Sequence, residues 1–358
     1  MMNNNKKIFK LLLEDNNDKL SVLNKSELKY LLHYLNKYYL EYRKKLNIDK
    51  DITFGIEIEL EHFKGTYADL WPFECEINKI IGNNDWNIKN DITLIFGREL
   101  ATEVYTDAER TWNDIFNVCD YASNYLEVGK RSAGHINVGS HILSNNALYW
   151  YRFLKLWSVY ENVIYRFSYG EYLSYFPFIP LGSKPVACVL IDRLDYLKTF
   201  IDEDAHRLIV NAFPKEISPG FLKKNGISFY KMLDKLDYSE YEYDNVLEIR
   251  SPISTLDTVI WQNYVNFFVH LLLYCKSDKF NDDILDRRMN KIKDIVLDID
   301  NYDNIYLDDA IELSDMIFDN NLDKIYFLRQ YLKNFEVSSE KFKKAKCYTL
   351  KRDYGLKK

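Results

Sequence analysis

The chain has 358 residues, of which 47% are hydrophobic and 28% are charged, so it can bury a sizeable core and is not a disordered chain. It carries 48 lysines and arginines against 54 aspartates and glutamates, a formal net charge of −6, which argues against a large nucleic-acid-binding surface. The five cysteines are odd in number, scattered and never spaced as C-x-x-C. This spacing argues against a disulfide framework and a zinc ribbon, so we expect reduced thiols.

The apolar segments are too short or too interrupted for membrane insertion. Residues 8–13 are broken by Lys10 and followed by two acids, unlike the apolar region of a signal peptide. The longest apolar stretch, 265–275, contains Asn266 and His270 and is shorter than a bilayer-spanning helix. We therefore expect a cytoplasmic protein without a membrane partner.

The periodicity of the apolar residues divides the chain into three parts. Residues 1–50 carry apolar side chains at three- and four-residue spacing, which predicts a helical N-terminal extension. Residues 51–277 mix strand and helix patterns and form the predicted catalytic core. Residues 278–358 return to a helical pattern, with an acidic linker at 298–303, and end in a lysine-rich tail that we expect to be solvated.

The predicted elements of the core begin with a strand in which apolar and polar residues alternate. The strands are expected at 54–61, 91–96, 99–105, 135–142 and 246–250. Helices are expected at 147–167 and 256–274, where apolar residues follow a helical period. Residues 169–185 contain three prolines and two glycines, which indicates a long loop. The fold class predicted from these elements is α+β.

The predicted strands carry an unusual set of polar residues on one face, because residues two apart in a strand share a face. The set comprises Glu57, Glu59 and Glu61 of the first strand, Glu99 and Glu103, then His135, Asn137 and His141, and finally Glu248 and Arg250. One interpretation is the wet face of an amphipathic sheet. However, alternate glutamates without an interleaved lysine or arginine forgo the charge pairing of a solvated sheet, which favours a metal site. Oxygen ligands with an imidazole suit Mg²⁺ or Mn²⁺.

Two residues of this set have an ordinary explanation as well as a functional one. His135 follows Gly134 in the segment SAGHINVGSH, and such a histidine is often satisfied by backbone groups. Arg250 lies two residues after Glu248, and a plain ion pair between them is the alternative to a role in binding. A divalent metal and an arginine on one sheet face would together suit a nucleoside triphosphate.

Four segments occur in order along the chain: FGIEIELEHF at 54–63, WNIKNDITL at 86–94 with GRELATEV at 97–104, SAGHINVG at 132–139, and NVLEIRSPISTLD at 245–257. In order and approximate spacing they resemble the motifs of the amidoligase family, which is similar to the glutamine synthetase and glutamate–cysteine ligase superfamily of carboxylate–amine ligases. The resemblance covers about residues 52–275. Asn137 stands where the family has a second histidine.

The resemblance implies a glutamine synthetase-like fold, with a curved, mostly antiparallel sheet, helices on its outer face, and helical N- and C-terminal additions. The metal ligands that it implies are Glu57, Glu59, Glu99, Glu248 and His135. It also implies that Arg250 contacts the phosphates of ATP, that Arg166 lies on the substrate or phosphate side, and that His135 completes the coordination or contacts phosphate.

The implied activity is the ATP- and Mg²⁺-dependent joining of a carboxylate to an amine through an acyl phosphate. The partners would be a carboxylate and an amine, each on a small molecule, a peptide or a protein, and the sequence does not distinguish among these. Two other classes stay open. One is a metal-dependent phosphotransferase or hydrolase on the same sheet, and the other is a binding protein that has lost turnover, with which Asn137 is compatible.

Overall fold

The computed structural model describes residues 19–20, 27, 41–82, 86–129, 131–144, 146–169, 226–228, 231, 246–292 and 307–332. Within these residues the protein is α+β, with one six-stranded antiparallel sheet and seven α-helices. Several predicted features lie outside the described residues: nearly all of the N-terminal extension before residue 41, the loop at 169–185 beyond its first residue, the linker at 298–303 and the basic tail.

The sheet has the strand order β2-β3-β1-β4-β6-β5, and every neighbouring pair is antiparallel. The strands are β1 (Phe54–Leu60), β2 (Asn87–Lys89), β3 (Arg98–Ala101), β4 (Gly134–Gly139), β5 (Ile227–Ser228) and β6 (Val246–Ile249). Thus β1, the strand with the clearest alternation in the sequence, lies inside the sheet between β3 and β4. The strands predicted at 54–61 and 246–250 are confirmed within one residue at each end.

The strand predicted at 99–105 spans only Arg98–Ala101, so Glu103 lies outside it. Three further local predictions were wrong, each for an identifiable reason. Residues 91–96 form a turn, in which the Asp91 carboxylate accepts hydrogen bonds from the backbone N–H and the hydroxyl of Thr93, both at 2.7 Å. Residues Asn87–Lys89 pair with β3 instead. The strand at 135–142 ends at Gly139, and Ser140–Ile142 form a short 3₁₀ helix, so His141 leaves the strand face and contacts the Asp51 carbonyl oxygen at 2.8 Å.

The third error concerns the end of the N-terminal extension. Residues 41–50 are not helical. The Asp107 carboxylate accepts the backbone N–H of Leu46 at 2.9 Å and that of Ile48 at 3.1 Å. Because this tertiary contact uses backbone donors that a helix would need, it holds the segment in an irregular conformation.

The helices are α3 (Tyr67–Ile80), α4 (Glu109–Ala122), α5 (Ala147–Tyr169), α10 (Thr258–Lys276), α11 (Asp282–Ile292), α12 (Leu307–Ile317) and α13 (Asn321–Leu332). Of these, α5 and α10 confirm the helices predicted at 147–167 and 256–274 within two residues at each end. Asp257 explains where α10 begins, because its side chain accepts the backbone N–H of Val259 as an N-cap. No helix among the described residues is long and apolar enough to span a membrane.

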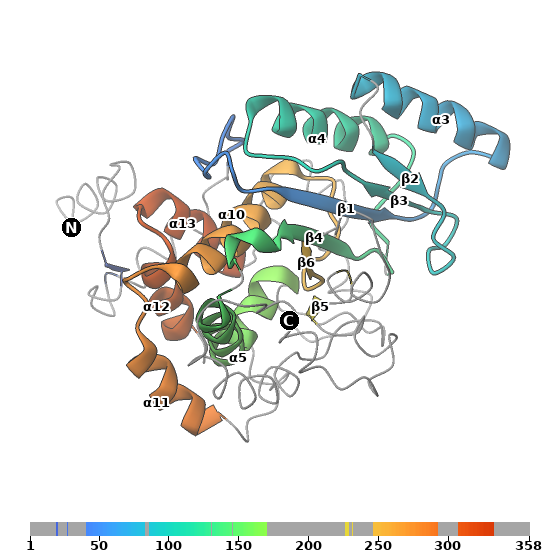
Figure 1. Ribbon diagram of the computed structural model, residues 1–358. Helices are drawn as coiled ribbons and strands as arrows, with labels where there is room; N and C mark the ends of the chain where they lie inside the picture. The colour runs from blue at the N-terminus through green and yellow to red at the C-terminus, as the bar shows by residue number, and fades with distance from the viewer. Residues whose placement is uncertain are drawn as a thin grey trace, which may run out of the picture.

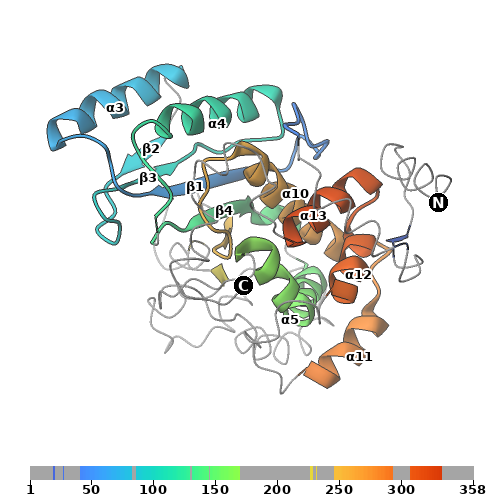
Figure 2. The ribbon, with the colours of Figure 1, turned by 180° about the vertical axis from the view of Figure 1, so that it is seen from behind.

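Helices cover the apolar face of the sheet. The Phe54 ring of β1 stacks on Trp112 of α4, with ring centroids 5.4 Å apart. Trp261 of α10 packs so closely on β4 that a Cβ on Gly134 would lie 2.5 Å from its ring. Figures 1 and 2 show α3 and α4 at one end of the molecule and α11 at the other. With its apolar face covered in this way, the sheet has its opposite, polar face available for a functional site.

The C-terminal helices belong to the same core. Helix α10 is buried on nearly every side, as expected for a central helix with an almost continuous apolar sequence. Phe267 of α10 stacks on Phe327 of α13 with centroids 4.9 Å apart, and Phe167 of α5 lies 5.0 Å from the same ring. The described part of residues 278–358 therefore packs on the helices of the core.

Gly97 directly precedes β3 and lies against Leu60, the last residue of β1. A Cβ on Gly97 would lie 2.1 Å from the carbonyl oxygen of Leu60, and backbone atoms cannot move away without disturbing the sheet. We expect Gly97→Ala to lower the free energy of unfolding by about 3 kcal/mol, the upper part of the usual range for overpacking. Urea denaturation would measure the loss.

Gly55→Ala provides the matched control. The nearest atom to a Cβ on Gly55 is the Thr102 hydroxyl at 3.6 Å, an ordinary contact distance. This variant should change the free energy of unfolding by less than about 1 kcal/mol. Equal stability of the two variants would contradict the proposed clash.

Candidate metal centre

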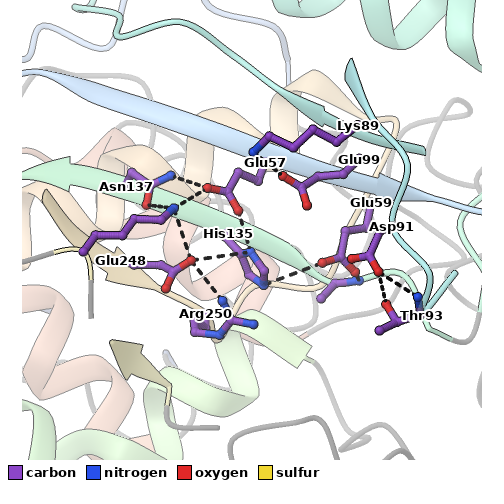
Figure 3. Close-up of polar contacts among 12 residues, drawn as sticks. Glu57, Glu59, Lys89, Asp91, Thr93, Glu99, His135, Asn137, Glu248 and Arg250 are labelled. Atoms are coloured by element: carbon purple, nitrogen blue, oxygen red, sulfur yellow. Dashed lines mark hydrogen bonds and ion pairs between the residues drawn. The ribbon is translucent and has the colours of Figure 1, made fainter. Parts of the chain in front are cut away.

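Strand register brings together the five residues predicted as metal ligands. Across β1, Glu57 lies opposite His135 of β4 and Glu59 lies opposite Glu99 of β3. Glu248 of β6 joins them through its pairing with β4. Figure 3 shows the side chains of these five residues gathered on one side of the sheet.

These polar residues are largely removed from water. The exposed fraction is 9% for Glu57, 6% for Glu59, and 4% for both His135 and Glu248. The interpretation as a wet face is therefore wrong for these four residues. Buried carboxylates need a positive partner or hydrogen-bond donors. The partners of each carboxylate therefore indicate whether it could bind a cation.

One group, which we call the histidine cluster, comprises Glu57, His135 and Glu248, whose potential ligand atoms all lie within 4.8 Å of one another. His135 Nδ1 is 2.9 Å from Glu57 Oε2 and 3.9 Å from Glu248 Oε1. An ionised carboxylate only accepts hydrogen bonds, so the contact with Glu57 places a proton on Nδ1. In the neutral imidazole, Nε2 then carries the free lone pair.

A second group, the carboxylate cluster, comprises Glu59, Asp91 and Glu99, again with ligand atoms within 4.8 Å of one another. Glu59 Oε2 accepts the backbone N–H of Ala133 at 2.8 Å. Glu99 Oε1 lies 3.3 Å from the ammonium of Lys89, which is half exposed. Among the residues that the structure describes, the cluster therefore brings three carboxylates together against a single lysine.

Two cationic side chains of the described residues contact the histidine cluster. Lys231 donates to Glu57 Oε1, donates to Asn137 Oδ1 at 2.9 Å, and lies 3.3 Å from Glu248 Oε1. Arg250 Nη1 donates to Glu248 Oε1 at 2.9 Å, so the ion pair anticipated from the sequence is present.

The amide of Asn137 completes this arrangement. Its Nδ2 donates to Glu57 Oε1 at 2.8 Å, while its oxygen accepts from Lys231. The residue that replaces a histidine of the family motif therefore holds two charged groups of the cluster in place.

The surroundings shift the pKa of carboxylates in opposite directions in the two clusters. Burial raises the pKa of Glu57, but the hydrogen bonds and charges of His135 and Lys231 outweigh it and hold that pKa well below its usual range. The pKa of Glu248 is also lowered, because His135, Arg250 and Lys231 outweigh its burial. Burial alone would lower the pKa of Lys231, but the charges and hydrogen bonds of Glu57 and Glu248 raise it. The ammonium therefore stays protonated.

Glu59 behaves differently. Burial raises its pKa to about 7, and the nearby charges of Asp91 and Glu99 add to this effect, against the opposing influence of His135 and of the Ala133 N–H. Among the described residues, the carboxylate cluster thus meets one lysine, whereas the histidine cluster meets a lysine and an arginine.

His135 links the two clusters. Its Nε2 is buried and has no hydrogen-bond partner among the residues that the structure describes. This atom lies 3.9 Å from Glu59 Oε1, too far for a hydrogen bond. Figure 3 shows the ring between Glu57 on one side and Glu59 on the other. A buried lone pair directed at a group of carboxylates suits coordination of a cation.

Glu61 shares the β1 face but has a different role. It is fully buried, and its two carboxylate oxygens accept the backbone N–H groups of Ile95 at 2.9 Å and Arg131 at 3.1 Å. It therefore ties the turn that carries Asp91 to the segment that leads into β4.

Arg166 contacts the C-terminal helices. Its Nε donates to the Tyr331 carbonyl oxygen at 3.2 Å, and its guanidinium lies 5.1 Å from the centre of the Tyr331 ring. No contact between Arg166 and the two clusters is found among the described residues. Its role toward substrate or phosphate stays a prediction.

Sequence reasoning missed two residues of the site, Asp91 and Lys231. Asp91 was assigned to a strand, although Asp followed two residues later by Thr is also a turn signal that would have placed its carboxylate at the end of β2. Lys231 is separated from Glu57 by 174 positions, and nothing in its local sequence marks it as a site residue.

Comparison with known proteins assigns no family to the chain. A scan against protein-family models finds no matching model, and a search of curated proteins finds no match. The residues of the two clusters and their cations therefore carry the functional inference.

Proposed function

We propose that this protein is an ATP- and Mg²⁺-dependent carboxylate–amine ligase, built on a glutamine synthetase-like sheet, that forms an amide or isopeptide bond through an acyl phosphate. The observation that carries the proposal is the gathering, on one face of an antiparallel sheet, of five carboxylates, three cations, and one imidazole whose Nε2 has no hydrogen-bond partner among the described residues. The order of the four sequence motifs supports the same reading.

The site fits divalent magnesium or manganese. Glu59, Asp91 and Glu99 offer hard oxygen ligands within 4.8 Å of one another, and His135 Nε2 offers a lone pair beside them. Glu57 and Glu248 offer further oxygens. When bound, such an ion neutralises phosphate oxygens and withdraws charge from the phosphoryl group being transferred.

The side chains of the chain itself would position the reactants. Arg250 is partly exposed at the edge of the histidine cluster, and a guanidinium can meet two phosphate oxygens with parallel hydrogen bonds. Because most of the site is buried, its fixed charges act more strongly on the developing charge than they would in water. Formation of an acyl phosphate would overcome the unfavourable condensation of a carboxylate with an amine, and most of the catalysis would come from positioning and charge stabilisation.

Product analysis tests the proposal. Full-length protein is incubated with Mg·ATP and pooled amino acids, peptides or cell extract, and products are identified by mass spectrometry. The proposal expects ADP and phosphate together with a condensed product that has lost one water. Nucleotide turnover that yields a phosphorylated or cleaved species without a new amide would instead identify a phosphotransferase or hydrolase. Absence of turnover with every pool would contradict the proposal and favour a binding protein.

Metal affinity should depend on pH through Glu59. Its pKa of about 7 means that below pH 7 the side chain is largely protonated and must lose this proton to coordinate a cation. Mn²⁺ affinity should therefore fall as the pH is lowered below 7, by at most about tenfold per unit for one displaced proton, and level off above about pH 8.

Titration calorimetry checks this dependence. At pH 6, measurements in two buffers of different ionisation enthalpy should report the release of close to one proton per Mn²⁺ bound, and at pH 8.5 almost none. An affinity that is constant between pH 6 and pH 8 would show that Glu59 does not take part.

A further inference from the structure

The histidine cluster is already neutralised by the chain itself. With the imidazole of His135 neutral, Glu57 and Glu248 contribute two negative charges, and Lys231 and Arg250 contribute two positive charges in direct contact with them. The three N–H groups of Lys231 have three oxygens within reach, those of Glu57, Asn137 and Glu248. The ammonium therefore lies among the oxygens that a cation in this cluster would have to coordinate.

The carboxylate cluster is not neutralised in this way. Within the part of the chain that the structure describes, its three carboxylates, Glu59, Asp91 and Glu99, have one lysine contact, at 3.3 Å between Lys89 and Glu99. When all three are ionised, the charge left over is two negative charges, which matches one divalent cation. The geometry thus separates a cluster that has its counter-charge from one that lacks it.

A chain of hydrogen bonds runs from Lys231 through Glu57 to His135, whose ring lies beside the carboxylate cluster. Lys231 and Asn137 hold Glu57 Oε1, and the other oxygen of Glu57 accepts the Nδ1 proton of His135. Because Nδ1 donates to Glu57, the lone pair of the neutral ring is on the buried Nε2, which faces Glu59. A carboxylate that orients a metal-binding histidine in this manner is a common outer-shell arrangement. Glu57 therefore suits the role of a positioning residue.

We propose that this chain binds one divalent cation in the absence of nucleotide, at Glu59, Asp91, Glu99 and His135 Nε2, and that the Lys231 ammonium takes the place of a second cation between Glu57 and Glu248. The inference rests on the proposed function for the nature of the cation. It changes the expected set of ligands, because Glu57 and Glu248 become partners of Lys231. The substrate phosphates would then meet a fixed ammonium on this side of the site.

Metal stoichiometry tests the inference without an activity measurement. Full-length protein free of nucleotide is equilibrated with Mn²⁺ by dialysis, and bound and free ion are distinguished by electron paramagnetic resonance. Wild type should bind one Mn²⁺ per chain, and Lys231→Met should bind two, because the variant removes the ammonium and leaves Glu57 and Glu248 without it. Lys44→Met is the control, since it removes a lysine that pairs with the exposed Glu109, and its stoichiometry should stay at one.

The outcomes separate this inference from the proposed function. Two ions on wild type, or one ion on folded Lys231→Met, would overturn the inference and leave the ligase proposal standing. No specific ion on wild type would overturn both.

A second pair of variants applies even where Lys231→Met does not fold. Glu99→Gln should weaken Mn²⁺ binding more than about 100-fold, beyond the usual effect of an outer-shell change. Glu248→Gln should change the affinity less than about threefold, because Glu248 is a lysine and arginine partner in this scheme. The reverse order of effects would overturn the inference.

Discussion

Glu59→Gln is expected to lower ATP-dependent turnover by at least about 10³-fold, because a neutral amide cannot balance the charge of the bound cation and about 4 kcal/mol of charge stabilisation is lost. The fold should survive this change. The amide oxygen of glutamine can still accept the Ala133 N–H, which Glu59 accepts at 2.8 Å.

The stability of the metal-free variant gives this prediction a second readout. Burial raises the pKa of Glu59 from 4.5 to about 7, so the folded state binds more protons than the unfolded state between these two values. The contribution of Glu59 to stability is therefore lost as the pH rises from about 4.5 through about 7. At pH 8, metal-free Glu59→Gln should be at least as stable as wild type in urea denaturation.

A surface glutamate provides the control. Glu109 is exposed and pairs with Lys44, and Glu109→Gln should leave both turnover and stability within error of wild type. If Glu59→Gln keeps more than a tenth of wild-type turnover, or is clearly less stable than wild type at pH 8, then Glu59 does not have the role described here.

Glu61→Gln is expected to lower the free energy of unfolding by about 3 kcal/mol, because both oxygens of a fully buried carboxylate accept backbone N–H groups. An amide has only one oxygen, so its NH₂ group must face the N–H of either Ile95 or Arg131. Donor would then face donor in a site closed to water.

Glu61→Gln should also weaken metal binding, because the backbone connects the contacts of Glu61 to the candidate metal centre. The turn held by Glu61 through Ile95 also carries Asp91, a member of the carboxylate cluster. We expect Mn²⁺ affinity to fall by about 10-fold or more, the size of effect usual for groups that support metal ligands from outside. Urea denaturation and Mn²⁺ titration measure the two effects on one preparation.

Glu76→Gln is the matched control for Glu61→Gln. The Glu76 side chain is 43% exposed on α3 and pairs with Lys79, and such surface changes stay within about 0.5 kcal/mol. A loss of less than about 1 kcal/mol for Glu61→Gln would mean that the turn and the β4 segment are held by other contacts.

The regular elements could be predicted because their signals are local. Alternation in β1 and helical spacing in α5 and α10 predicted these elements to within two residues at each end. The turn at 91–96 and the irregular segment at 41–50 could not be predicted in the same way. In both, polar side chains compete for backbone donors, namely Asp91 locally and Asp107 across 61 positions of the chain.

The ligands proposed for the candidate site were likewise only partly predictable. Alternation placed Glu57, Glu59 and Glu61 on one strand face, but nothing local separates their roles. One pairs with an imidazole and a lysine, one is short of positive charge, and one binds two backbone segments. These differences depend on what lies opposite each side chain, which strand register and loop packing decide.

The sequence by itself determined which residues of β1 share a face, because the two-residue period of a strand is a property of the backbone at each position. It thereby determined that an acidic set and an imidazole would lie on a sheet. Only the tertiary structure decided which carboxylates meet a cation. Lys231 lies 174 positions from Glu57, and electrostatic balance depends on distance and burial rather than on position in the chain.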